Sequence, residues 1–187
     1  MLEKVIIVVV VAVVVLAAGV AWWFENGSAS HSEGGHAADV DSNELTKLEK
    51  YWIMYDVGNS AFVMLIATII PIYFNYLAKS AGISEVNYLA YWGYAVSIAT
   101  LLTALAGPVF GTVADTKGYK KPVFTIALGI GAIASVALGF AKYWLAFLVV
   151  FVIAKVGYSV TLVFYDSMLV DVTLEDRMDE VSSQGYA

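Results

Sequence analysis

The stretch GTVADTKGYKK, residues 111–121, is a short polar turn between two long apolar segments. These segments, predicted over residues 88–114 and 122–141, each reach the length of about 20 mostly apolar residues that a helix needs to cross a bilayer. Within the turn, Gly118 permits a positive φ, and Gly111 is expected to let one helix end approach its neighbour. The stretch therefore predicts a tight hairpin of two membrane-spanning helices.

The composition of the whole chain agrees with a membrane environment. Of its 187 residues, 60% are hydrophobic and 14% are charged, whereas soluble domains have about 45–50% apolar and about 25% charged residues. Five apolar segments are long enough to span a bilayer. They are residues 5–24, 52–78, 88–114, 122–141 and 143–170. The sequence therefore predicts an all-α, polytopic membrane protein with about five transmembrane helices.

Three regions follow from this pattern. Residues 1–24 are predicted to form an anchor helix, with a cleaved signal peptide as the alternative, and residues 25–48 form a flexible polar linker. Residues 49–187 hold the remaining spans and are predicted to form one helical bundle.

Several classes of function are not expected. The net charge is −6, which disfavours a nucleic-acid partner, and there is no cysteine for a disulfide or a thiolate site. His31 and His36 match no ligand spacing that fixes metal geometry. Without a phosphate-binding glycine loop or a catalytic constellation, we expect no enzyme activity, no metal and no cofactor.

The basic residues predict an orientation. Assigned alternately to the two sides of the membrane, the loops divide the basic residues unequally, and the richer side should be cytoplasmic. That side holds Lys47, Lys50, Lys117, Lys120, Lys121 and Arg177, and the other holds Lys4, Lys79 and Lys142. The loop 115–121 is thus expected in the cytoplasm, and the chain in the cell (inner) membrane.

The turn at 111–121 also resembles a known signature. Gly111, Asp115, Gly118, Lys120 and Lys121 match the loop between the second and third helices of the major facilitator superfamily, which implies a conformational-switch role. Thr116 and Tyr119 stand where that family commonly has basic residues.

Two further stretches resemble the vacuole-effluxer-like branch of that superfamily. They are YDVGNSAF (55–62), followed by PIYF (71–74), and FYDSMLVD (164–171), followed by SSQGYA (182–187). The resemblance implies the first four helices of the family's N-terminal half, preceded by an unrelated anchor helix.

The resemblance also implies a function. We expect a fragment or shortened relative of a secondary-active transporter, with proton-coupled export of amino acids or small polar metabolites as the implied activity. Such a chain is not expected to transport alone, and its expected partners are the lipid bilayer and other membrane subunits or helices. The alternative is a non-transporting accessory subunit of a larger membrane complex.

Polar residues inside the spans are the candidates for a substrate or proton site. At about 100° per residue, Asp56, Asn59 and Ser60 fall on one face of the predicted span 52–78. The alternative for Asp56 is a structural role in helix packing or capping.

A second group of candidates lies on the span 143–170. Lys155, Tyr158, Ser159 and Asp166 share one side of this helix by phase. Lys155 is expected to line a cavity or a subunit contact, and the alternative is a buried pair with Asp56 or Asp166.

Two stripes of small residues are expected to let helices pack closely in lipid. They are Gly107-x3-Gly111 and Gly131-x3-Ser135-x3-Gly139. Aromatic residues at the non-cytoplasmic ends are expected to form an interfacial belt. They are Tyr88, Tyr91, Trp92, Tyr143 and Trp144.

Overall fold

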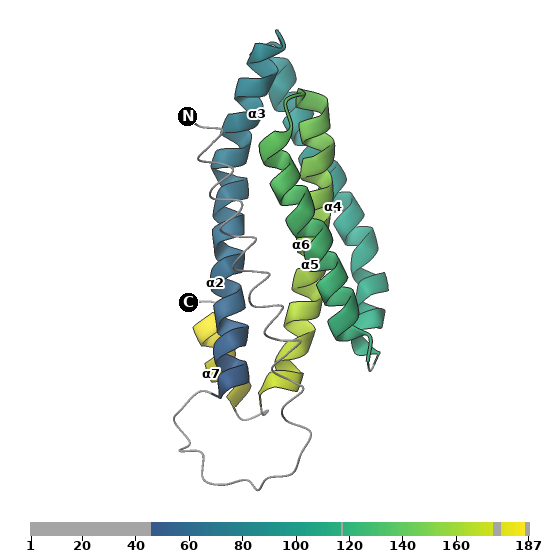
Figure 1. Cartoon of the computed structure of the whole chain (residues 1–187). Helices are drawn as coiled ribbons and strands as arrows, with labels where there is room; N and C mark the ends of the chain where they lie inside the picture. The colour runs from purple at the N-terminus through teal and green to yellow at the C-terminus, as the bar shows by residue number, and fades with distance from the viewer. Residues whose placement is uncertain (1–45, 117, 174–176, 186–187) are drawn as a thin grey trace, which may run out of the picture.

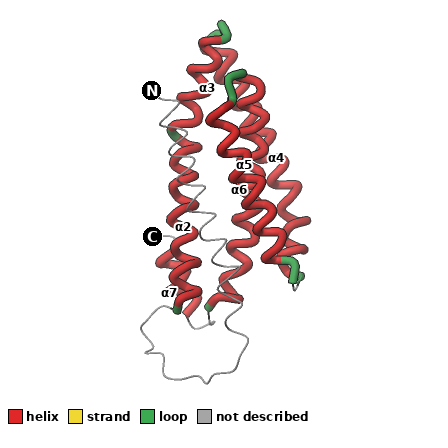
Figure 2. Tube along the Cα trace, in the orientation of Figure 1, coloured by secondary structure: helices red, strands yellow, loops and turns green. Residues whose placement is uncertain are grey.

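The computed structural model describes residues 46–116, 118–173 and 177–185, and all regular structure in these ranges is helical (Figure 2). The predicted anchor helix, nearly all of the linker, and His31 and His36 lie outside the described residues. The helices are α2 (Lys47–Ala67), α3 (Ile69–Ser80), α4 (Glu85–Asp115), α5 (Lys120–Phe140), α6 (Trp144–Val172) and α7 (Met178–Gly185).

Four segments of this bundle are long and apolar enough to cross a membrane. They are Gly58–Ser80, Glu85–Asp115, Lys120–Phe140 and Trp144–Val172. Each corresponds to one of the spans predicted after residue 49. The chain is therefore an integral, multi-pass membrane protein.

The first of these spans is interrupted, which the sequence analysis did not foresee. α2 ends at Ala67 and α3 begins at Ile69, with Thr68 between them. Pro71 explains the break, because a proline has no N–H to donate to the carbonyl four residues earlier and its ring crowds that carbonyl. The Thr68 hydroxyl donates to the Met64 carbonyl, which also accepts from the Thr68 amide.

α6 lies at the centre of the bundle and packs along both α4 and α5 (Figure 1). The predicted stripe Gly131-x3-Ser135-x3-Gly139 is buried. At its start the backbones nearly touch, since a Cβ added to Gly157 would lie 3.1 Å from the Cα of Gly131. This stripe packs as predicted, against a glycine of α6 that the sequence analysis did not name.

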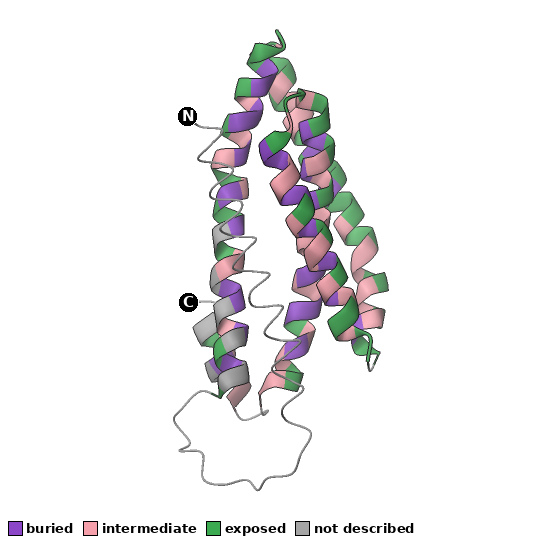
Figure 3. Ribbon diagram, in the orientation of Figure 1, coloured by how far each residue is buried: buried purple, intermediate pink, exposed green. Residues whose placement is uncertain are grey.

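The prediction for the stripe Gly107-x3-Gly111 was wrong for the described residues. A Cβ added at either glycine would meet no described atom within 4 Å. Only 6% of the most apolar window of α4 is buried (Figure 3). The physical reason is that α4 contacts α6 with another face, so the glycines point away from the described helices.

Aromatic residues at the α3–α4 end pack more closely than an interfacial belt requires. Tyr91 stacks on Trp144 with ring centroids 5.0 Å apart, and Trp92 lies 4.6 Å from Phe151. Of the five residues predicted for the belt, Tyr143 is 79% exposed. Because the other four pack against the apolar core, this end of the bundle is held by a dense aromatic cluster.

Candidate functional site

Polar side chains form a line between α2 and α6. The Asn59 amide donates to Oδ1 of Asp56 at 3.5 Å, and the Asn59 side chain lies near the Tyr158 hydroxyl. The Lys155 ammonium lies 5.7 Å from the centroid of the Tyr158 ring. We call these four residues the polar line. The fold thus joins candidates that lie about 100 positions apart along the chain.

The polar line is shielded from solvent and carries opposite charges at its two ends. Asp56 is 6% exposed, and the other three residues are half-buried. The exposed carboxylate of Asp166 is close enough to interact electrostatically with Asp56 and Tyr158. Two carboxylates therefore lie at the Asp56 end, and one ammonium lies at the Lys155 end.

The remaining two candidates stand apart from the polar line. Ser60 is exposed and makes no hydrogen bond to another described residue. The Ser159 hydroxyl donates to the Lys155 carbonyl at 2.9 Å, a bond within its own helix. Helical phase placed these serines on the same helix faces as the charged residues, but phase does not decide what a hydroxyl contacts.

Lys155 does not form the buried pair that the sequence analysis kept as an alternative. The ion pairs among the described residues join Lys79 to Glu85, Lys120 to Asp171 and Arg177 to Glu49. Within the described residues, the ammonium of Lys155 is therefore supported by a ring face and has no carboxylate partner. Such a charge within a span normally faces the protein interior or a water-filled cavity.

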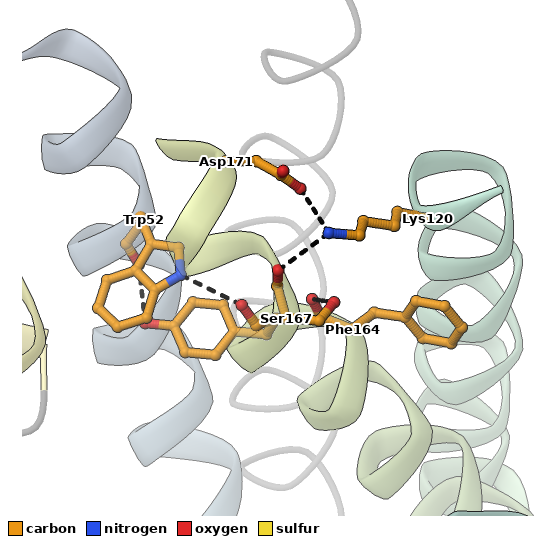
Figure 4. Close-up of polar contacts among 6 residues, drawn as sticks. Trp52, Lys120, Phe164, Ser167 and Asp171 are labelled. Atoms are coloured by element: carbon orange, nitrogen blue, oxygen red, sulfur yellow. Dashed lines mark hydrogen bonds and ion pairs between the residues drawn. The ribbon is translucent and has the colours of Figure 1, made fainter. Parts of the chain in front are cut away.

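The predicted switch loop is a tight turn, as its glycine indicated. Gly118 has a φ of 87°, which confirms the predicted positive φ. The Lys120 ammonium lies 2.7 Å from Oδ2 of Asp171 and donates to the Ser167 carbonyl at 3.2 Å (Figure 4). A cation there neutralises the negative end of the α6 dipole. Asp115 and Lys121 are exposed.

A reciprocal contact between Trp52 and Tyr165 joins α2 to α6, and the sequence analysis did not identify it. The Trp52 indole donates to the Tyr165 carbonyl at 3.3 Å, and the Tyr165 hydroxyl donates to the Trp52 carbonyl at 3.1 Å (Figure 4). The rings stack with centroids 4.4 Å apart. No sequence pattern marks such a pair, because its members are 113 positions apart.

Glu49 is a second residue that the sequence analysis missed. Its side chain is 2% exposed, and its carboxylate accepts from the Thr173 hydroxyl at 2.6 Å and the Thr46 amide at 2.7 Å. Arg177 lies 3.6 Å away. Burial alone would raise the pKa of Glu49, but these hydrogen bonds and the Arg177 charge hold that pKa below its ordinary value of 4.5.

Part of the Glu49 arrangement could have been found in the sequence. Thr46-x-x-Glu49 before an apolar run is the pattern of a capping box, and both of its hydrogen bonds are present. The contacts of Glu49 with Thr173 and Arg177 depend on how α2, α6 and α7 assemble, so they could not have been predicted this way.

The described bundle falls almost entirely within a known family. Residues 46–181 match the family described as vacuole effluxer Atg22 like, and the polar line and the switch loop lie inside the match. The chain belongs to this family. This confirms the resemblance drawn from the three quoted stretches.

Relatives of this Atg22-like chain include major facilitator transporters. It is 38% identical over 145 residues to an uncharacterized MFS-type transporter, YxiO, of Bacillus subtilis, which covers 76% of the chain and 34% of YxiO. It is 31% identical over 115 residues to the multidrug resistance protein MdtG of Enterobacter lignolyticus, covering 61% of the chain and 26% of MdtG. No solved structure matches the chain.

The Atg22-like chain corresponds to only part of these relatives. It spans about a third of the length of YxiO and less of MdtG. Neither name describes an enzyme. The four spans are therefore those of a partial major facilitator fold within a transporter family.

Proposed function

We propose that the chain forms part of the N-terminal bundle of a secondary-active transporter for small zwitterionic metabolites, with amino acids as the first class to test. One observation carries the proposal. The polar line places carboxylates at one end and an ammonium at the other, between two helices that span the membrane. A zwitterion presents the complementary charges.

Each residue of the polar line has a role in this proposal. Asp56, with Asp166 nearby, would bind the substrate ammonium, and Lys155 would bind its carboxylate. Asn59 and Tyr158 join the two ends and would orient the substrate by hydrogen bonds. Charged groups inside a membrane mark substrate and ion pathways, because their burial is too costly without such a use.

The same carboxylates support coupling to protons. Carboxylates inside membrane proteins are typical carriers of protons, and Asp56 is 6% exposed. A substrate ammonium that binds Asp56 would displace a proton carried there. We therefore propose that binding of the substrate and release of a proton are linked at Asp56.

Transport by this proposal also needs helices beyond those described. Major facilitator transporters bind substrate between two halves near the midplane of the bilayer, and the chain spans about a third of its relative YxiO. We propose that the chain works with such helices in a longer protein or an assembly. No observation on the described residues favours the accessory-subunit alternative.

The substrate class can be tested by binding to the chain purified in mild detergent together with the helices that complete the transporter. Thermal unfolding in detergent would be followed with leucine, with the amine that lacks its carboxylate (isoamylamine), and with the acid that lacks its amine (4-methylpentanoate). Leucine should raise the unfolding temperature by several degrees, and the two single-charge ligands should have little effect. Equal shifts with all three ligands, or no shift with leucine, would contradict the proposal.

Variants of the polar line would then assign the charges. Asp56→Asn and Lys155→Met should each remove the leucine effect. Asp179 and Lys142 are exposed in other parts of the chain, so Asp179→Asn and Lys142→Met are matched controls that should retain it.

A further inference from the structure

A buried carboxylate ties together three helices at the α2–α7 end of the bundle. Glu49 belongs to α2, Thr173 caps the C-terminus of α6, and Arg177 directly precedes α7. Because the carboxylate accepts from Thr173 at 2.6 Å and lies 3.6 Å from Arg177, it links α2 to both ends of the α6–α7 connection. We infer that Glu49 is a latch that holds α2 against α6 and α7.

At its other end, α2 is interrupted close to Pro71, and the chain can bend there. The helix is interrupted at Thr68, three residues before Pro71, so one backbone hydrogen bond of a continuous helix is missing there. Kinks of this kind are points at which the two helix segments can change their relative angle. Thr68 is thus a hinge between α2 and α3.

The two sides of this hinge are held with different strength. α3 is embedded in the aromatic cluster, where Phe74 is fully buried and packs against Trp92 at 5.7 Å and Phe147 at 6.1 Å. α2 is attached through separate buried side chains, among them Trp52, Phe62 and Leu65, and α7 lies against it (Figure 1). We therefore take α3 as the fixed segment and α2 as the segment whose angle the latch sets.

The contacts of α2 with α6 occur at a few separate points. Phe62 meets Tyr158 near the middle, Trp52 and Tyr55 meet Tyr165 further along, and Glu49 meets Thr173 at the end. Of these, the Glu49 contact is furthest from the hinge at Thr68. A bond at the end of a lever acts through the longest arm, so this contact limits how far the end of α2 beyond the Trp52–Tyr165 pair can open.

The latch also positions the candidate site. Asp56 lies on α2 between the hinge and Glu49, and its electrostatic neighbours Tyr158 and Asp166 lie on α6. An opening of α2 would therefore separate Asp56 from both. Only this last step rests on the proposed function, since the motion of α2 itself does not require that the chain binds a substrate.

The experiment measures the angle of α2 directly. The chain has no cysteine, so two introduced cysteines can carry spin labels without competing sites. One pair, Lys50→Cys with Val170→Cys, spans α2 and α6 on exposed positions at the latch end. A control pair, Ile72→Cys with Leu145→Cys, spans α3 and α6 at the fixed end, also on exposed positions.

The variants distinguish the contact of Glu49 with Thr173 from the capping box at the start of α2. Thr173→Val removes the hydroxyl that reaches Glu49 from α6, and Glu49→Gln removes the charge. Thr46→Val removes only the cap hydroxyl, which accepts from the Glu49 amide within α2. Distances between the labels would be measured by pulsed electron paramagnetic resonance on the full chain in lipid nanodiscs.

The distances between the labels in each variant test whether Glu49 holds α2 in place. In Thr173→Val and Glu49→Gln, the first pair should gain a population at longer distance, while the control pair and Thr46→Val remain as in the unmodified chain. An unchanged first pair in Thr173→Val would overturn the latch. An equal change in Thr46→Val would also overturn it, because the cap would then be responsible, and so would broadening of both pairs. Leucine binding is a separate measurement, so failure of the proposed function would leave these distances unaffected.

Discussion

Single residues attach α2 to α6, and the stacked pair of Trp52 and Tyr165 is the clearest example. Each side chain donates to the other residue's carbonyl, so neither indole nor phenol is buried without a hydrogen bond. Tyr165→Phe keeps the stack and loses one bond, so it should lower stability by about 0.5–1.5 kcal/mol. Trp52→Ala, at a site 1% exposed, should cost about 3–5 kcal/mol.

Thermal unfolding of the two variants in detergent checks this order. Tyr76→Phe is a suitable control, since Tyr76 is 62% exposed. Equal losses in Tyr165→Phe and Trp52→Ala would show that the hydrogen bond, and not the stacked and buried rings, carries the contact.

Glu49 predicts a dependence of stability on acid. Its pKa is lower in the folded chain than its ordinary value of 4.5. A carboxyl with a depressed pKa contributes stability that is fully present above the ordinary value and is lost as the pH falls through the folded value. The unfolding temperature should therefore fall as the pH drops below about 4.5, and less so in Glu49→Gln. A slope that is identical in both proteins would contradict the prediction.

At the scale of elements, the approach of α5 to α6 depends on the absence of side chains. A Cβ at Gly157 would lie 3.1 Å from the Cα and 3.2 Å from the amide nitrogen of Gly131, and backbone atoms cannot move aside as a flexible side chain can. Gly157→Ala should therefore push the helices apart and cost about 1–3 kcal/mol.

The matched control for this prediction lies on the same helix as Gly131. A Cβ at Gly129 would meet nothing within 4 Å, so Gly129→Ala should be neutral or should stabilise α5 by up to about 1 kcal/mol through its helix propensity. The unfolding temperatures of the two alanine variants make the comparison. If both variants lost stability equally, the close contact would not be the cause.

At the scale of the whole molecule, basic residues gather at one end of the bundle. Lys50, Lys120 and Arg177 stand at the starts of α2, α5 and α7, and Lys79 and Lys142 stand at the other end. The distribution of Lys and Arg predicts that the first end faces the cytoplasm. A cysteine at the exposed Thr116 should therefore react with a membrane-impermeant thiol reagent only after lysis, and one at the exposed Ser80 should react in intact cells.

Reaction of the Thr116 cysteine before lysis, with protection of the Ser80 cysteine, would invert this orientation. The cysteine-free chain itself is the control for non-specific labelling. The same pair of variants also tests whether the membrane is the inner membrane, because the reagent must reach the Ser80 cysteine from outside.

The sequence by itself determined the fold class and the family, and the candidate site remains a prediction. Runs of about 20 apolar residues predict spanning helices. Lipid offers no hydrogen-bond partner to the backbone, and a helix pairs its N–H and C=O groups internally. The resemblance of three short stretches predicted the family, and helical phase placed Lys155 beside Tyr158. Gly118 was predicted to adopt a positive φ because few other residues can.

Only the tertiary structure decided which helix faces meet. The two small-residue stripes look alike in sequence, yet Gly131 packs against Gly157 while Gly111 meets no described atom. The partners of Trp52 and Glu49 likewise come from beyond α2, 113 and 124 positions along the chain. Periodicity reports which residues share a face of one helix, and it contains no information on the second helix that this face will contact.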